Sequence, residues 1–302
     1  MITFDEWSSR AVMIESGGLR IATHDVGGAA GDAPVVTYLH GYPSSSHDIV
    51  PVIAELDSIG DGWRVLSLDF PGFGASEKPP GHPFTIHACA DAVEAMWRRA
   101  GVTSTVLYSH DYGVSVGQEL LARRVEATLE VELTGAGWSN GGIYPDLHRP
   151  TIGQQMLVDP DHGAEVAAAM TEELFATGIG ITWGTRTPMS PEVLHEIWRS
   201  MARDDGTRIA NELLHYMAER RRYVDRWTGA LERCDLPQRF VWGDLDPVSG
   251  AHMIARVEER IPAAMVHRMD DIGHWPPLEA PAEVAAAIEA FRPRPSTPFW
   301  WK

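Results

Sequence analysis

The chain has 302 residues and a formal net charge of -17 at pH 7, which argues against nucleic-acid partners because these are bound through clustered Lys and Arg. Its two cysteines, Cys89 and Cys234, are too few for a disulfide framework and are not spaced as a metal or redox motif, so we expect no metal and no cofactor. The N-terminus lacks the features of a signal peptide and no apolar run reaches the ~20 residues of a membrane span, so we expect a cytoplasmic protein without a membrane partner.

Strand-like and helix-like segments alternate along the first half of the chain. A hairpin is expected at 11–14 and 19–24, where two short alternating runs flank a Ser-Gly-Gly turn. Alternation of strands and helices predicts an α/β fold with a mostly parallel, doubly wound sheet and helices on both faces. The expected strands are 35–39, 63–68, 105–109 and 129–134, the last closing on Gly135-Ala136-Gly137-Trp138, and the expected helices are 48–56, 86–100 and 113–123.

The strand at 105–109 runs into a turn that reads Ser-His-Asp-Tyr-Gly and then into a helix. A nucleophile on such an elbow needs small residues two before and two after it, so that strand and helix can approach closely. Ser109 and Gly113 meet this demand around Asp111. Ser115, in a literal G-x-S-x-G, lies about one helical turn further on, where a helix would carry its hydroxyl away from the sheet edge. The pattern favours Asp111 as nucleophile over Ser115, and over the simpler role of a helix cap.

A second motif follows the strand at 35–39, where the sequence reads His40-Gly41-Tyr42-Pro43. Gly41 permits an unusual backbone turn. The backbone amide of Tyr42 can then point at the same spot as the amide of Tyr112, which follows Asp111. Two such donors would form an oxyanion hole.

The character of the chain changes after Trp138. From about Ser139 to Trp227 the segments are helical or loop-like, without a clear strand. This predicts a helical cap inserted into the sheet domain, with core residues 1–138, cap residues 139–228 and core residues 229–302. Beyond the cap, strands are expected at 238–242 and 265–269, helices at 251–260 and 281–291, and the terminal Trp300-Trp301 is expected to dock on the body.

Four polar residues follow predicted strands: His40, Asp111, Asp246 and His274. The carboxyl ends of parallel strands meet at one edge of a sheet, so these side chains are expected to converge. Asp244 competes with Asp246 as the acid, but Gly-x-x-Asp-Pro places the second carboxylate on the far side of the turn. Asp246 is therefore favoured over Asp244 as the acid.

With these motifs the sequence resembles the α/β-hydrolase family over essentially its whole length. Within the family it resembles the branch with an aspartate nucleophile, to which epoxide hydrolases and haloalkane dehalogenases belong. It is more closely similar to the mesoderm-specific transcript-like proteins through the elbow at 109–113, through 139–145 with His148-Arg149-Pro150, and through 226–231. The resemblance implies the α/β-hydrolase fold with a helical cap and a catalytic triad in the chain order nucleophile, acid, histidine, which Asp111, Asp246 and His274 fit.

An aspartate nucleophile determines the expected chemistry. A carboxylate with a pKa of about 4 is ionised at neutral pH and attacks a saturated carbon without a base, which gives an alkyl ester of Asp111. His274, oriented by Asp246, would then activate a water molecule that attacks the ester carbonyl, while the Tyr42 and Tyr112 amides hold the oxyanion. Water and a small hydrophobic substrate are the expected partners of a chain that acts as a monomer or a homodimer.

The leaving group separates epoxides from alkyl halides. An epoxide oxygen needs a proton donor, and the resemblance implies a tyrosine of the cap, for which Tyr216 has the spacing seen in the family. Tyr144 and Tyr223 are candidate second donors and substrate-binding residues. Halide binding in the dehalogenases uses Trp and Asn where this chain has Tyr112 and Tyr42. Further side chains expected to contact the substrate are His40, Trp138 and Trp183.

The leading prediction is hydrolysis of hydrophobic epoxides to diols. The alternatives are a haloalkane dehalogenase, an ester or lactone hydrolase that acts through Ser115, and a binding module on the same fold with little turnover. An intact triad argues against the binding module.

Overall fold

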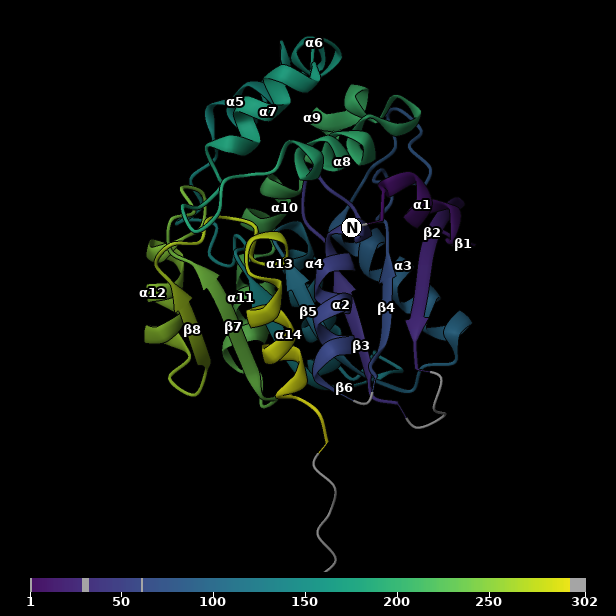
Figure 1. The fold of residues 1–302 in the computed structure, drawn as a ribbon, viewed down its shortest axis with the longest axis vertical. Helices are drawn as coiled ribbons and strands as arrows, with labels where there is room; N and C mark the ends of the chain where they lie inside the picture. Colours follow the sequence, from purple (N-terminus) through teal and green to yellow (C-terminus); the bar gives the residue numbers. More distant parts are fainter. Residues whose placement is uncertain (1, 29–32, 61, 294–302) are drawn as a thin grey trace, which may run out of the picture.

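The computed structural model describes residues 2–28, 33–60 and 62–293. Its centre is an eight-stranded sheet in the order β1-β2-β4-β3-β5-β6-β7-β8 (Figure 1). β2 pairs antiparallel with β1 and β4, and every other pair of neighbours is parallel, which confirms the predicted α/β fold and its hairpin. The docking predicted for Trp300-Trp301 lies outside the described residues. The strands are β1 Val12–Ser16, β2 Leu19–Gly27, β3 Val35–Leu39, β4 Arg64–Leu68, β5 Ser104–His110, β6 Glu132–Ser139, β7 Gln238–Gly243 and β8 Met265–Met269.

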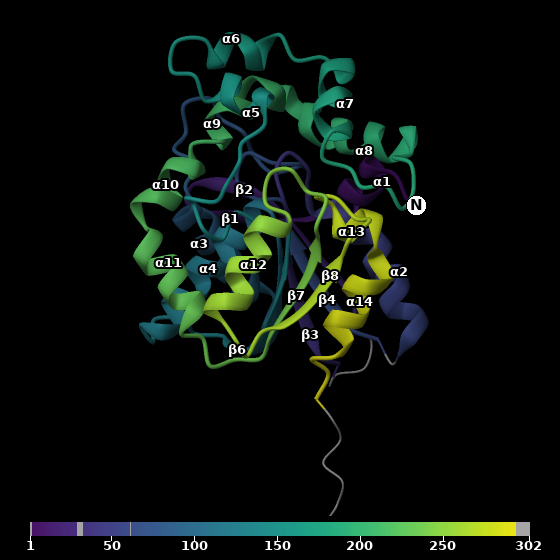
Figure 2. The ribbon, with the colours of Figure 1, turned by 90° about the vertical axis from the view of Figure 1, so that its left-hand side faces the viewer.

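Helices cover both faces of the sheet (Figure 2). Because both faces are covered, the central strands are nearly continuous apolar runs, and β3 is buried over four of its five residues. None of the helices in the described ranges is long and apolar enough to cross a bilayer. On one face lie α2 (Val50–Ile59) and α14 (Pro281–Glu289), and on the other α3 (Ile86–Ala100), α4 (Tyr112–Val125), α11 (Val224–Glu232) and α12 (Ala251–Arg260); short helices at the edges are α1 (Phe4–Ser9), η1 (Ser46–Ile49) and α13 (Pro276–Glu279).

The helix predicted at 86–100 has the same bounds as α3, and its ends show why. The Thr85 hydroxyl accepts a hydrogen bond from the Ala88 amide, which satisfies one of the free donors of the first turn. Gly101 ends the helix with a left-handed φ of 66°, a conformation that glycine adopts without strain. Local signals at both ends therefore account for the bounds of this helix.

The strand predicted at 129–134 is wrong at both ends. β6 begins later and continues to Ser139, through the glycines that the sequence predicts as its end. The physical reason is aromatic packing: a Cβ at Gly135 would lie 2.4 Å from the Phe291 ring, and one at Gly137 would lie 2.3 Å from the Tyr108 ring. The glycines make room for these rings inside a strand and do not turn the chain.

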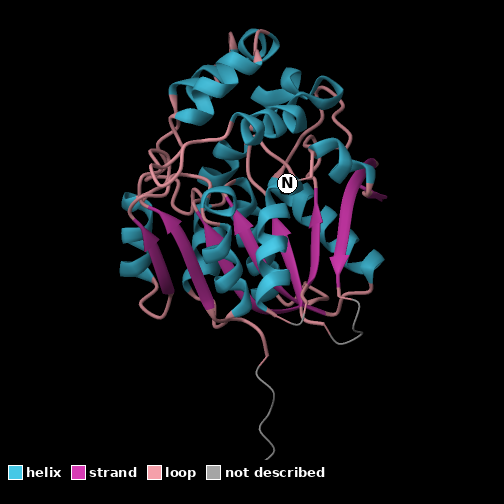
Figure 3. Ribbon diagram, in the orientation of Figure 1, coloured by secondary structure: helices cyan, strands magenta, loops and turns pink. Residues whose placement is uncertain are grey.

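Between β6 and β7 the chain forms a helical cap above the carboxyl ends of the strands (Figure 3). The predicted cap limits of 139–228 begin at the last residue of β6 and end inside α11, which packs on the core helix α4. There the buried Glu119 accepts hydrogen bonds from the guanidinium of Arg226 and the indole of Trp227. The cap contains α5 (Ile152–Leu157), α6 (Gly163–Ala168), α7 (Glu172–Gly180), α8 (Pro191–Ala202), η2 (Arg203–Ile209), α9 (Ala210–Leu213) and α10 (Tyr216–Arg222).

Candidate active site

Asp111 lies at the turn between β5 and α4. Its φ of 46° and ψ of -108° are unusual for a residue with a side chain, and such strain persists where the surroundings enforce it. The close approach of the elements explains the small neighbours. A Cβ at Gly113 would lie 2.2 Å from the Leu39 carbonyl oxygen, and one at Gly41 would lie 2.9 Å from the Asp111 Cβ. The turn thus holds Asp111, which is 6% exposed, at the carboxyl edge of the sheet.

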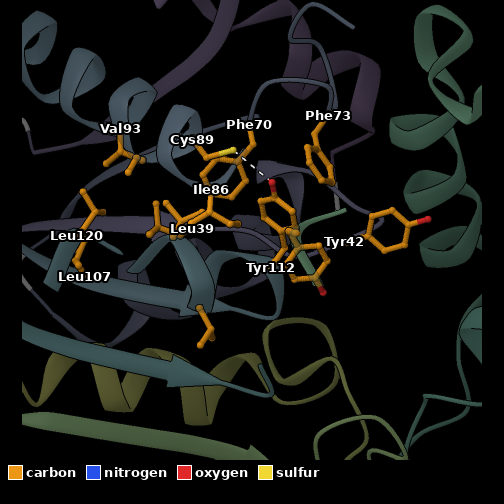
Figure 4. Packing of buried hydrophobic residues seen from close by; sticks show 14 of the residues in the cluster. Leu39, Tyr42, Phe70, Phe73, Ile86, Cys89, Val93, Leu107, Tyr112 and Leu120 are labelled. Carbon is orange, nitrogen blue, oxygen red and sulfur yellow. Dashed lines mark hydrogen bonds between the residues drawn. The ribbon is translucent and has the colours of Figure 1, made fainter. Parts of the chain in front are cut away.

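Two backbone amides adjoin the Asp111 carboxylate. The Tyr42 amide, just beyond β3, donates a hydrogen bond of 2.7 Å to Asp111 Oδ2. The Tyr112 amide is the first of α4, where the helix itself supplies no acceptor for it. The Tyr112 hydroxyl is directed into the core and lies 3.5 Å from the Cys89 sulfur, beside Phe70 (Figure 4). The Tyr42 amide is therefore beside the nucleophile, as an oxyanion-hole donor must be, and the Tyr112 phenol is not.

Asp246 is held by hydrogen bonds on both of its oxygens. The Ser249 hydroxyl donates to Oδ2 at 2.7 Å, the Asn140 amide nitrogen donates to the same oxygen at 3.1 Å, and the Val248 amide donates to Oδ1 at 2.8 Å. The competing Asp244 forms an ion pair with Arg268 at 2.9 Å. Asn140 also bonds the backbone of Gly243, so it connects the end of β6 to the turn that carries the acid.

The His274 ring joins the two carboxylates. Its Nδ1 lies 2.8 Å from Asp246 Oδ2, and its Nε2 lies 3.5 Å from Asp111 Oδ1. The three residues come from three different turns at the carboxyl ends of β5, β7 and β8. The structure thus brings together the side chains that the sequence predicts as a triad.

The loop that carries His274 is bonded to the cap. The His274 amide donates a hydrogen bond of 2.7 Å to the carbonyl of Thr182, which follows α7. Glu279 lies in α13, just after this loop. Its carboxylate accepts hydrogen bonds from the amides of Gly184 in the cap and of Gly273 and Trp275 in the loop. The position of the His274 backbone therefore depends on both parts of the protein.

Charge interactions determine the protonation of the triad. Burial alone would lower the pKa of His274, but Asp246 and Asp111 raise it well above its usual value of 6.5. Burial would raise the pKa of Asp111, but its hydrogen bond to His274 and the charge of that ring bring it below its usual value of 3.8. At neutral pH an ionised Asp111 therefore lies beside an imidazolium, and the carboxylate is in the form that attacks carbon.

Tyr216, a predicted residue of the cap, packs on Tyr112 next to this arrangement. It begins α10, is 1% exposed, and its ring centroid lies 4.6 Å from that of Tyr112. Its hydroxyl forms no hydrogen bond within the described part of the chain, and burial and the charge of Asp111 raise its pKa above the usual 10.0. The Tyr216 proton is therefore held by the phenol and has no acceptor among the described residues.

Two of the predicted substrate contacts lie inside the core. His40 is fully buried, with Nδ1 2.8 Å from the Gly41 carbonyl and Nε2 accepting the Phe70 amide at 3.0 Å, so both ring nitrogens are used by the backbone. Trp138 lies within β6, and its indole donates to the Gln238 side chain. Strand packing encloses the two rings and neither lines the apolar cavity described below, so the structure gives no support to either as a substrate contact.

Three other predicted substrate contacts have their side chains engaged by other parts of the protein. The Tyr144 hydroxyl donates to Glu232 at 3.2 Å, and the Tyr223 ring packs on that of Trp227 at 5.2 Å. The Trp183 indole donates to the Thr187 carbonyl at 3.0 Å. Neither tyrosine is placed to serve as a second proton donor.

Sequence reasoning missed Arg220 and His148 as residues of this region. Burial lowers the pKa of His148 to about 3, and the charges of Arg220, Asp111, Asp246 and His274 all act on it. His148 belongs to the His148-Arg149-Pro150 motif, which carries part of the family resemblance but predicts no role for the ring. Its spacing from the triad carried no signal, because it lies in an irregular segment before α5.

A mainly apolar cavity of 270 Å³ lies between the cap and the triad. At its inner end it is lined by Tyr42 and His274, both of which contact Asp111. Its walls come from the cap helices α5 to α8 and include Leu157, Val166, Met170, Phe175 and Met201. Its lining suits an apolar molecule whose reacting atom reaches Asp111.

Asp48, buried under the oxyanion-hole loop, provides a test of the charges around this site. Its carboxylate accepts a hydrogen bond from the Ser44 hydroxyl, and burial raises its pKa from 3.8 to about 8. Between these pH values the unfolded chain is ionised here while the folded protein keeps the proton. This contribution to stability is therefore complete below pH 3.8 and is lost as the pH rises toward 8.

We expect Asp48→Asn to remove that pH dependence. Asn keeps an acceptor for Ser44 but does not titrate. From pH 5 to pH 7 the wild type should lose about 1.4 kcal/mol of unfolding free energy per pH unit relative to the variant. Urea unfolding of both proteins across this range measures the difference, and equal slopes would show that folded Asp48 is ionised.

Comparison with known proteins agrees with this architecture. The chain matches the family model described as alpha/beta hydrolase fold over residues 34–281. It is 35% identical over 294 residues to the mesoderm-specific transcript homolog protein of Bos taurus, across 94% of this chain and 86% of that protein. It is 36% identical over 259 residues to LipZ of Mycobacterium tuberculosis, across 85% of this chain and 88% of that protein.

A solved structure extends the agreement to three dimensions. A loop variant of a haloalkane dehalogenase from Bradyrhizobium elkanii matches with a TM-score of 0.73 and 19% identity, over 93% of this chain and 96% of that one. At this identity the match shows the fold alone. The family model spans every strand from β3 to β8 and all three triad residues. The chain therefore belongs to the alpha/beta hydrolase fold family, as its sequence motifs imply.

Proposed function

We propose that the protein hydrolyses hydrophobic epoxides to diols through an ester of Asp111, with Tyr216 as the proton donor. The observation that carries this proposal is the Tyr216 phenol, whose ring lies 4.6 Å from that of Tyr112, the next residue after Asp111, and whose hydroxyl has no acceptor in the described part of the chain. An epoxide oxygen that enters from the apolar cavity would supply that acceptor. The halide of an alkyl halide leaves as an anion and needs no proton donor of this kind.

In the first half-reaction, Asp111 attacks one carbon of the epoxide. A bond forms between a carboxylate oxygen and that carbon, and the bond from the carbon to the epoxide oxygen breaks, with the electron pair going to the oxygen. Tyr216 donates its proton to this oxygen. The products of the step are a hydroxyalkyl ester of Asp111 and a phenolate at Tyr216.

In the second half-reaction, His274 serves as the base. Ester formation removes the negative charge of Asp111, which is one cause of the raised pKa of His274, so the ring releases its proton more readily. Water then attacks the ester carbonyl, with the Tyr42 and Tyr112 amides beside the oxyanion. The proton that the ring released restores Tyr216, and neutral His274 takes one proton of the attacking water. The bond from the carbonyl carbon to the alkyl oxygen then breaks, and the proton on His274 passes to this oxygen of the diol. The second water proton leaves the new carboxyl group of Asp111 and returns to His274.

Halide chemistry has less support from the same region. A halide leaving group is stabilised by free N–H donors beside the nucleophile. The Trp275 indole, which lines the cavity, donates to the Thr182 hydroxyl at 3.0 Å, and the Asn140 amide nitrogen is engaged by Gly243 and Asp246. A panel of epoxides, haloalkanes and activated esters, read by diol formation, acid formation and halide release, distinguishes the candidates. Halide release without diol formation would replace the epoxide proposal by a dehalogenase.

Tyr216→Phe is expected to slow formation of the Asp111 ester by about 10²–10⁴-fold, the usual contribution of a positioned general acid. Ester hydrolysis, which depends on His274, should change much less. Rapid-quench measurement of the two steps with an epoxide substrate separates them. Tyr223→Phe is the matched control, because Tyr223 packs on Trp227 away from the triad. Equal slowing in both variants would remove Tyr216 from the donor role.

A further inference from the structure

Arg220 carries a charge that no described carboxylate neutralises at ion-pair distance. The residue is 2% exposed, one turn after Tyr216 on α10. Its Nη1 donates a hydrogen bond of 2.7 Å to the Gly142 carbonyl, and its Nε has no partner. A buried guanidinium costs free energy unless something nearby compensates it, so its position calls for a physical reason.

The backbone leaves room for this guanidinium. A Cβ at position 142 would lie 1.3 Å from Arg220 Nη1, so a side chain there would displace the arginine. Gly142 follows Asn140-Gly141, the segment that also supports Asp246 and packs against the Asp111 backbone. The guanidinium is thus held by the same loop that supports the triad.

The guanidinium lies over the ring of Tyr216, with its carbon 4.9 Å from the ring centroid. Four groups face Tyr216: the Asp111 carboxylate, the phenols of Tyr42 and Tyr112, and the Arg220 guanidinium. Asp111 favours the protonated phenol, and Arg220 favours the phenolate. Arg220 is therefore the one positive group among the four.

We propose that Arg220 is a positioning residue that stabilises the phenolate of Tyr216 and thereby makes Tyr216 a stronger acid toward the substrate. This inference rests on the proposed function. Before the first half-reaction the negative charge lies on Asp111, and afterwards it lies on Tyr216. Arg220 interacts with both groups, so the buried cation has an anionic neighbour before and after the step. The negative charge that passes from Asp111 to Tyr216 therefore stays within reach of the Arg220 guanidinium throughout the step.

A substrate-free titration tests this inference. A polyfluorinated tyrosine incorporated at position 216 ionises at a lower pH than tyrosine with little change of shape, and its phenolate is read by absorbance. Removing the cation in Arg220→Gln should raise the pKa of this phenol by about two units, from a charge ~5 Å away at an effective dielectric of ~20. Arg220→Lys keeps the charge and should keep most of the shift. Arg221→Gln, an exposed neighbour on the same helix, should leave the titration unchanged.

Gly142→Ala disturbs the contact between Arg220 and Tyr216 without changing either residue. It serves as the test if Arg220→Gln does not fold. The added Cβ forces the guanidinium away while its charge is kept, so the pKa of the fluorinated phenol should rise by a smaller amount. An unchanged or lower pKa in Arg220→Gln, or in Gly142→Ala where that is the folded variant, overturns the inference. Because this readout needs no substrate, absence of epoxide turnover would count against the proposed function alone.

Discussion

Replacing Asp111 by alanine is expected to abolish turnover, with a loss of ~10⁴-fold or more, because no other group would form the covalent intermediate. Ser115→Ala is expected to keep most of the activity. Ser115 lies in the first turn of α4, is fully buried, and its hydroxyl has no hydrogen-bond partner among the residues that the structure describes. Within the described ranges, therefore, no base is hydrogen-bonded to the Ser115 hydroxyl to activate it.

The two variants form a matched pair. Both side chains are buried near the start of α4, so thermal unfolding of each shows whether a loss of activity is a loss of fold. Steady-state turnover with the substrate found in the panel provides the comparison. A dead Ser115→Ala with an active Asp111→Ala would leave a serine hydrolase as the better description, and the ester chemistry of Asp111 would have to be abandoned.

His274→Gln is expected to accumulate the ester of Asp111. Asp111 attacks without the help of a base, so the first half-reaction should proceed, while loss of the base should slow hydrolysis of the ester by about 10²–10⁴-fold. Intact-protein mass spectrometry after mixing with a true substrate should show one added substrate mass, on the peptide that contains Asp111. Wild type should show little of this species.

The added mass also identifies the leaving group. An epoxide adds its whole mass because its oxygen stays attached, whereas a haloalkane adds its mass less the halogen acid. Absence of any adduct with a substrate that wild type turns over would mean that water attacks the substrate directly or that another residue is the nucleophile. Asp246→Asn is a useful companion, because it keeps the imidazole but removes the carboxylate that orients it.

The triad could be predicted from sequence because its members depend on local rules. Asp111, Asp246 and His274 each follow a strand, and parallel strands present their carboxyl ends at one edge. The elbow at Asp111 needs small neighbours, and Gly113 meets that need by its approach to the Leu39 carbonyl. These requirements are visible within a few residues of each side chain.

The surroundings of the triad could not be predicted in the same way. Trp138 and Tyr144 carry the same amphipathic signal as residues that line a cavity, and only the packing of Phe240 on Trp138 and of Glu232 on Tyr144 places them elsewhere. Arg220 stands in a run of three arginines that reads as a solvated helix face. Contacts between segments far apart in the chain determine where these three side chains lie. The hydrophobic periodicity of a single sequence does not reveal such contacts.

The bond from the His274 amide to the Thr182 carbonyl limits how this scaffold can be re-engineered. A cap taken from another family member would have to supply a carbonyl oxygen at the same point, as well as an amide for Glu279 in place of that of Gly184. A transplant chosen for cavity shape alone would leave the loop of the catalytic base without its hydrogen bonds. Loop-to-loop compatibility, and not pocket volume, is therefore the first criterion for exchanging lids on this core.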